Sequence, residues 1–245
     1  LLLPALIIGL PWFIRNAVVY GNFDLAGLAR HDQVVVGQLR TSEWIDQFGW
    51  ASLPSAFLTT TFRSFWGQFG WMAVPIDWRI YTALRMFSAI AVVGFVFRVA
   101  DVWESRQTPS KPLILLFCSG ALTLLAYLWY NTSFYQAQGR YLYPALIPIS
   151  LAWTIGIVES LRRENVRWIG PVLTLVTLYD LYQLFFGACG EKWKVAIHGA
   201  GTAYVGAGFI LPQPLQNLLP VVPYLFAALI SAISPFLFIV PYLSP

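Results

Sequence analysis

Residues 112–130 read PLILLFCSGALTLLAYLWY, a run of 19 residues without a charged side chain. An α-helix of this length measures about 28 Å, close to the roughly 30 Å hydrocarbon core of a bilayer. A bilayer core has no water to satisfy backbone N–H and C=O groups, so a chain that crosses it must be helical or form a closed barrel. The stretch therefore predicts a membrane-spanning α-helix.

Further runs of nearly uncharged residues have similar lengths. They cover 80–97, 141–158, 168–188 and 218–243, and residues 1–13 read like the end of another. A spanning helix needs about 20 predominantly apolar residues, and the complete runs are close to that length or longer. We therefore expect an all-α membrane protein, a multi-pass helical bundle with about six membrane segments, in which residues 1–245 form a single transmembrane domain.

The composition of the whole chain agrees with this class. Hydrophobic residues make up 58% of the chain and charged residues only 11%. A soluble domain has about a quarter of its residues charged, so this chain has too little polar surface for water and the lipid bilayer is its expected partner. The net charge of +4 is dispersed, with no basic run that would indicate nucleic-acid binding.

The first residues, LLLPALIIGL (1–10), read like the second half of a membrane helix. They lack an initiator methionine, and they lack the basic region and small-residue cleavage site of a signal peptide. We expect the N-terminal part of the native protein to precede Leu1, together with any site residues that it carries.

The distribution of Lys and Arg predicts which connectors face the cytoplasm, since short cytoplasmic loops are enriched in these residues. The connectors 98–111 and 159–167 carry six basic residues, whereas 131–140 and 189–217, which alternate with them, carry three. We therefore place 98–111 and 159–167 inside the cell. The expected external segments are 14–79, 131–140 and 189–217.

One apolar segment does not fit this alternation. Residues 195–215 are rich in Gly, Ala and Pro, and they could span the membrane, re-enter it or lie on its surface. If the segment spans the membrane, the last run, 218–243, crosses in the opposite direction.

The external region 14–79 contains an amphipathic segment, PSAFLTTTFRSFWGQF, at about 54–69. Its large apolar side chains share one helical face: Phe57, Leu58, Phe62, Phe65, Trp66 and Phe69. A short helix rich in Phe and Trp is typical of the membrane interface. The alternative is an aromatic belt that anchors the bundle without contacting a substrate.

Asp180 is the acidic residue that lies well inside a membrane run. A carboxylate in hydrocarbon costs several kcal/mol unless it is paired, so such a residue is a candidate functional group. It could face a polar cavity and bind a substrate hydroxyl or an arginine. Alternatively, it is a protonated or Tyr-paired structural residue, with Tyr179 and Tyr182 as neighbours.

Three external arginines are candidate ligands for an anionic headgroup. Arg140 begins a helix after Gly139, Arg15 follows the apolar PWFI, and Arg63 lies on the polar face of the amphipathic segment. A guanidinium can bind phosphate bidentately, and Gly139 would let the backbone approach a ligand closely. The alternative is three independent interfacial anchors.

The histidines and cysteines give no sign of a metal site. His31 and His198 are far apart and isolated in the sequence. Cys118 and Cys189 have no CxxC or His neighbour, which argues against a disulfide framework and against a metal site. We expect no cofactor in this stretch.

Four motifs together resemble a known family. They are PWFIRNAVVYGN (11–22), SFWGQFGWMAVP (64–75), QGRYLYPALIP (138–148) and the Asp-Leu-Tyr of 180–182. Their order is similar to the C-terminal half of bacterial GT-C glycosyltransferases, the protein-mannosyltransferase-like and aminoarabinose-transferase-like membrane enzymes. The resemblance covers roughly residues 1–187.

The resemblance implies an enzyme of the plasma (inner) membrane that transfers a sugar from a polyprenyl-phosphate donor to a cell-envelope acceptor, with inversion, on the external face. It implies that Arg140 and, less directly, Arg15 hold the donor phosphate. The catalytic Asp or Glu, and a divalent metal if the enzyme uses one, would lie in the part that precedes this sequence. The alternative function is a non-catalytic accessory subunit, with other membrane subunits as partners, in a larger photosynthetic or respiratory complex.

Overall fold

The computed structural model describes residues 2–21, 23–35, 37–106, 108–187 and 190–243. Clustering of contacts groups the chain into two compact units. The first consists of Leu1–Trp50 with Thr132–Tyr135, and the second of Ala51–Asn131 with Gln136–Pro245. The single transmembrane domain expected from the sequence stays a prediction.

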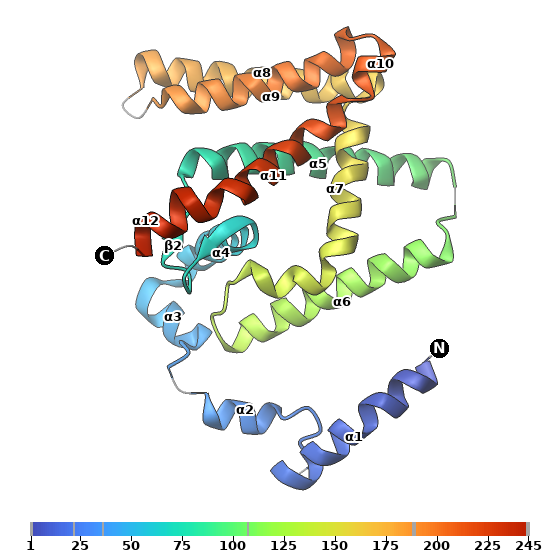
Figure 1. Ribbon diagram of the computed structural model, residues 1–245, viewed down its shortest axis with the longest axis vertical. Helices are drawn as coiled ribbons and strands as arrows, with labels where there is room; N and C mark the ends of the chain where they lie inside the picture. Colours follow the sequence, from blue (N-terminus) through green and yellow to red (C-terminus); the bar gives the residue numbers. More distant parts are fainter. Residues whose placement is uncertain (1, 22, 36, 107, 188–189, 244–245) are drawn as a thin grey trace. The chain divides into compact units, whose positions relative to one another are not determined.

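The first unit contains the helices α1 (Leu2–Tyr20), α2 (Leu28–Val34) and α3 (Thr41–Phe48) (Figure 1). The short segment Thr132–Tyr135 joins it through an isolated β-bridge between Arg40 and Phe134. The ring of Trp44 stacks on that of Tyr135, with their centroids 4.9 Å apart. Aromatic stacking and backbone pairing therefore hold this segment against α3.

The second unit begins with a short helix and a hairpin and continues with long helices. A 3-10 turn, Trp50–Ser52, leads into α4 (Leu53–Gly67). The strands β1 (Gln68–Phe69) and β2 (Val74–Pro75) then pair antiparallel, with Gln68 opposite Pro75. The remaining elements are α5 (Trp78–Glu104), α6 (Lys111–Ser133), η2 (Gly139–Ala145), α7 (Leu146–Ser160), α8 (Arg163–Phe186), α9 (Lys192–Ile210), α10 (Gln213–Gln216), η3 (Leu219–Val221), α11 (Val222–Ser234), η4 (Pro235–Ile239) and α12 (Val240–Leu243).

Helix α5 starts at a side-chain cap. The Asp77 carboxylate accepts hydrogen bonds from the Arg79 backbone N–H (2.8 Å) and from its guanidinium (2.6 and 2.9 Å). These bonds favour the ionised form, so the Arg79 side chain lowers the pKa of Asp77. The cap fixes the point at which the hairpin ends and the long helix begins.

Five stretches of the described chain are helical, long and apolar enough to cross a membrane. They are Trp78–Glu104, Lys111–Ser133, Gly139–Ser160, Arg163–Phe186 and Gln213–Tyr242. Each overlaps one of the complete runs predicted from the sequence, and a shorter apolar helix covers Leu6–Tyr20. The expected fold class, an all-α multi-pass membrane protein, is thereby confirmed.

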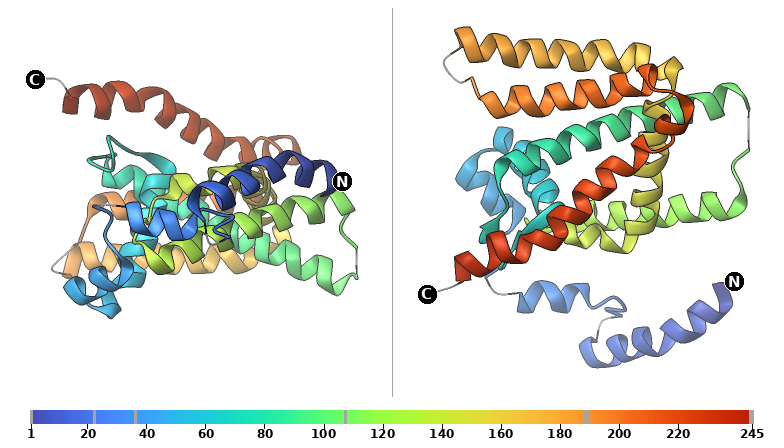
Figure 2. Two further views of the ribbon diagram at one scale, coloured as in Figure 1. Left: turned by 90° about the horizontal axis from the view of Figure 1, so that it is seen from below. Right: turned by 45° about the horizontal axis from the view of Figure 1, so that its top comes forward.

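The segment 195–215 falls mostly within α9, which lies antiparallel beside α8 (Figures 1 and 2). The Thr177 and Thr202 hydroxyls of the two helices share a hydrogen bond of 3.0 Å. With 19 residues, α9 is about 28 Å long and extends along most of α8. Most of 189–217 is therefore helical, and its external location stays a prediction.

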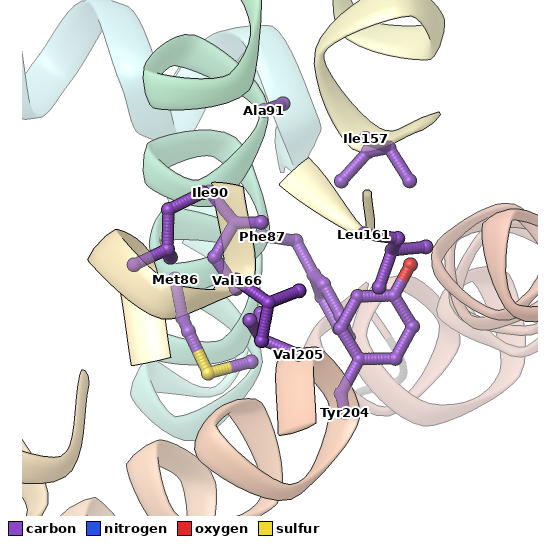
Figure 3. Packing of buried hydrophobic residues seen from close by; sticks show 10 residues of the cluster. Met86, Phe87, Ile90, Ala91, Ile157, Leu161, Val166, Tyr204 and Val205 are labelled. Atoms are coloured by element: carbon purple, nitrogen blue, oxygen red, sulfur yellow. The ribbon is translucent and has the colours of Figure 1, made fainter. Parts of the chain in front are cut away.

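The core of the second unit lies where α5, α7, α8 and α9 meet (Figure 3). Its buried side chains are Met86, Phe87, Ile90, Ala91, Ile157, Leu161, Val166, Ile169, Tyr204 and Val205. Ile157 and Val205 are completely buried. The core thus joins the α8–α9 pair to α5 and α7.

Helices α5 and α7 approach each other at two glycines. A methyl group on Gly94 would collide with the Gly156 carbonyl, and one on Gly156 would collide with the Ala91 carbonyl. Small residues let membrane helices come this close, which adds van der Waals contact where lipid removes the hydrophobic drive for association. In Figure 1, α7 runs across α5 at this point rather than beside it.

Candidate functional site

The helical turn η2 is held tightly against α4, and this contact positions Arg140. The Gly139 N–H donates to Ser64 Oγ (2.7 Å), and the Tyr143 hydroxyl donates to the Phe65 carbonyl (3.0 Å). A Cβ on Gly139 would lie 2.6 Å from the Phe65 backbone nitrogen and would collide with the Thr61 carbonyl. Gly139 therefore permits a close approach of η2 to α4. The sequence analysis had suggested instead that this glycine lets the backbone approach a ligand.

The Arg140 side chain is exposed and contacts two aromatic rings. Its guanidinium carbon lies 5.1 Å from the centroid of Trp71 and 5.7 Å from that of Tyr141. No salt bridge between described residues involves Arg140. Because a guanidinium has five N–H donors in a planar fork, it can bind an anion while its face rests on an aromatic ring.

A pocket of about 450 Å³ lies between α6 and η2. Its lining is mainly aromatic and apolar: Thr123, Ala126, Tyr127, Tyr130, Tyr141 and Pro144. Tyr127 is fixed from α4, because its hydroxyl shares a 2.6 Å hydrogen bond with Thr61 and its ring stacks on Phe57. Tyr141 lines the pocket, and its ring also contacts the Arg140 guanidinium. The exposed cation therefore lies beside the apolar pocket.

The turn between β1 and β2 carries Trp71. Gly70, Trp71 and Met72 all have positive φ (55°, 54° and 75°), and the Gln68 amide donates to the Met72 carbonyl (2.8 Å). Trp71 is 85% exposed. Its ring is therefore held outward, under the Arg140 guanidinium, by a turn with two non-glycine residues in a left-handed conformation.

The amphipathic segment predicted at about 54–69 is helical, as α4. Its aromatic face packs against protein: Phe62 and Trp66 contact a cluster around Tyr81 and Leu84. Arg63 lies over the Tyr81 ring, 5.4 Å from its centroid. Part of the predicted apolar face thus packs against protein, whereas Leu58 on the same face is 65% exposed. The location of α4 at the membrane interface stays a prediction.

Arg15 belongs to the first unit, and Arg63 and Arg140 belong to the second. The Arg15 guanidinium donates to Asn16 Oδ1 (3.2 Å) and to the Tyr20 hydroxyl (3.4 Å). Asn16, only 1% exposed, donates in turn to the Leu25 carbonyl. The gathering of the three arginines around one headgroup stays a prediction.

The Asp180 carboxylate contacts Nδ1 of His198 on α9. Their side chains are 12% and 22% exposed, respectively. The partner is thus not a neighbouring tyrosine, and the Tyr179 hydroxyl instead accepts from Gln183 (2.9 Å). Asp180 does not line the pocket beside Arg140. The sequence missed this pair because His198 lies on a different helix.

No group of three or more His, Cys, Asp or Glu residues that could hold a metal occurs in the part of the chain that the structure describes. Cys118 is a free, exposed thiol on α6. Cys189 lies outside the described residues.

Comparison with known proteins identified no relative of this chain. No protein family model, curated protein or solved structure matches the chain significantly.

Proposed function

We propose that this chain is the donor-binding part of a membrane glycosyltransferase of the GT-C type. It would transfer a sugar from a polyprenyl-phosphate donor to a cell-envelope acceptor on the external face of the plasma membrane. The observation that carries the proposal is the aromatic pocket beside Arg140, a cation without a carboxylate partner among the described residues.

The pocket and the cation match the two chemically different ends of a lipid phosphate. An apolar cavity lined by tyrosine rings suits an isoprenoid chain, and the tyrosine hydroxyls suit headgroup depth, where such rings are enriched. The guanidinium can bind two phosphate oxygens at once. Binding a phosphate there would also give the guanidinium an anionic partner, which it lacks among the described residues.

The first prediction concerns Arg140. Hydrogen bonds to a charged group contribute about 1.5–3 kcal/mol, which corresponds to roughly ten- to a hundredfold in affinity. Arg140→Ala should weaken binding of polyprenyl phosphate by that factor. Arg140→Lys should be intermediate, because it keeps the charge and loses the fork. Equilibrium binding to the protein in nanodiscs, with polyprenyl phosphate, polyprenol and inorganic phosphate as separate probes, measures the effect.

Arg167→Ala is the matched control. Arg167 also lies over an exposed tryptophan, 5.9 Å from the Trp168 centroid, and it is the last residue of the segment 159–167 assigned to the cytoplasm. It should not affect binding. Polyprenol binding should be the same in all variants. If Arg140→Ala binds polyprenyl phosphate like wild type, or Arg167→Ala weakens it equally, the phosphate role is wrong. A folded wild type that does not bind the lipid phosphate contradicts the proposed function and favours the accessory subunit.

A further inference from the structure

A second pocket, of about 280 Å³, lies within the first unit, between the end of α1 and α2. The side chains that the argument uses come from both helices and from their connector: Val19, Tyr20, Asp24, Arg30 and Gln33. Pockets for small molecules have volumes of about 300–1,000 Å³, so this one suits a group the size of a lipid headgroup.

Asp24 and Arg30 bring opposite charges to this pocket without pairing. No salt bridge between described residues involves either of them. The Arg30 backbone N–H donates to Asp24 Oδ2 (2.9 Å), and the other carboxylate oxygen has no donor among the described residues. The Arg30 guanidinium contacts Gln33 Oε1 (3.5 Å), one turn further along α2. The pocket therefore offers a ligand both a carboxylate and a guanidinium.

The C-terminal end of α1 adds partial negative charge on the side of Asp24. The last carbonyls of a helix have no partner within it, and this end of the helix dipole attracts cations. The last turn of α1 has no basic residue, and Val19 and Tyr20 of that turn line the pocket. Arg15 contacts the Tyr20 ring and does not line the pocket. A ligand should thus place a cation near α1 and Asp24, and an anion at Arg30.

An exposed apolar surface leads along α1 to the pocket. Ile14, Val18 and Val19 are between 53% and 78% exposed, and the apolar helix Leu6–Tyr20 ends where the pocket begins. In a bilayer such a surface contacts acyl chains. A lipid that lies along α1 would have its headgroup at the pocket.

We propose that this pocket binds a phosphoethanolamine group, with its ammonium at Asp24 and its phosphate at Arg30. An ammonium has three N–H donors for carboxylate and carbonyl oxygens, and a guanidinium binds phosphate oxygens well. The quaternary ammonium of choline has no N–H donor and is typically bound by a cage of aromatic rings. Among the described residues, only the Tyr20 ring lines this pocket.

The apolar surface of α1 favours phosphatidylethanolamine over a soluble compound with the same group. The site lies in the first unit and does not involve Arg140. The inference is therefore independent of the proposed function.

The test measures the headgroup preference, defined as the affinity for dioctanoyl phosphatidylethanolamine divided by the affinity for dioctanoyl phosphatidylcholine. Native mass spectrometry of the purified full chain in detergent measures both affinities. Wild type should show a preference of about two- to fivefold, the range expected of an exposed ion pair. The N-methyl and N,N-dimethyl lipids, which lose one and two N–H donors, should bind with intermediate affinities. Glycerophosphoethanolamine, which lacks acyl chains, should bind more weakly than the lipid.

Two variants separate the ends of the headgroup. Asp24→Asn keeps an oxygen for the Arg30 N–H and removes the negative charge, so it should lower the preference toward one. Arg30→Gln should weaken both lipids about two- to fivefold and leave the preference unchanged, because both carry the phosphate. The matched controls are Asp32→Asn, an exposed acid on α2 outside the pocket, and Arg163→Gln, an exposed arginine at the start of α8. Neither control should change the preference or the affinities.

A preference near one in wild type overturns the inference, as does a preference that Asp24→Asn leaves unchanged or that Asp32→Asn lowers equally. Thermal unfolding shows whether each variant is folded. If Asp24→Asn is not, the methylated lipids decide with wild type alone, and affinities that do not fall as N–H donors are lost contradict the site. If glycerophosphoethanolamine binds as tightly as the lipid, the ligand is a soluble phosphoethanolamine compound and the assignment of the pocket stands.

Discussion

At the scale of single residues, the pairing of Asp180 with His198 shows how two polar side chains are accommodated in an apolar helix pair. An unpaired carboxylate or imidazolium in hydrocarbon is costly, and each residue gives the other a partner. One helical turn away, Thr177 and Thr202 form a second polar contact between the same helices. The α8–α9 pair is thus held in register by polar contacts that lipid cannot replace.

We predict that Asp180 and His198 are energetically coupled. Asp180→Asn and His198→Gln should each destabilise the protein, and the double variant should lose less than their sum, with a coupling energy of about 1 kcal/mol. Unfolding in detergent measures all four proteins of the cycle. The cycle of Tyr179→Phe with His198→Gln is the control and should be additive. Additive effects of Asp180→Asn and His198→Gln would show that the pair does not contribute to stability.

At the scale of elements, the crossing of α5 and α7 depends on the absence of side chains at Gly94 and Gly156. Ile157, next to Gly156, is completely buried in the core that the two helices share with α8 and α9. A larger residue at the crossing would push the helices apart and open that core. The close contact of α5 with α7 therefore helps to keep Ile157 in the core.

Gly156→Ala should destabilise the protein by about 1–3 kcal/mol, because the added methyl group meets the Ala91 carbonyl and forces a backbone shift. Gly206→Ala is the matched control: it lies within α9, and a Cβ there meets nothing within 4 Å. Alanine is a better helix former than glycine by up to about 1 kcal/mol, so Gly206→Ala should be neutral or stabilising. Thermal unfolding that shows the same change for both variants would contradict the close crossing.

At the scale of the whole molecule, the distribution of basic residues predicts the orientation in the membrane. After Cys118 and Cys189 are replaced by serine, a membrane-impermeant maleimide should label Ser133→Cys in intact cells. It should label Ser105→Cys only after permeabilisation, because that residue lies in a connector assigned to the cytoplasm. Both serines are exposed, so accessibility within the protein does not bias the comparison. Labelling in the reverse pattern would overturn the orientation.

Part of the candidate site could be predicted from the sequence. The apolar runs indicated the helices, the amphipathic segment indicated α4, and the sequence singled out Arg140 and its preceding glycine. The pocket could not be predicted, because Tyr127 and Tyr130 come from α6 and Tyr141 comes from η2. The contact of Trp71 with Arg140 was also missed, since it joins two segments that are far apart in the sequence.

The sequence by itself determined that this is an all-α multi-pass membrane protein, because about 20 uncharged residues in lipid must satisfy their backbone hydrogen bonds within a helix. Only the tertiary structure decided that Asp180 pairs with His198, that Arg140 rests on Trp71, and that α7 crosses α5. The physical reason is that hydropathy is a property of one segment, which local composition fixes. A contact between segments depends on how two helices are rotated and displaced relative to each other, and side-chain packing across the interface sets that geometry.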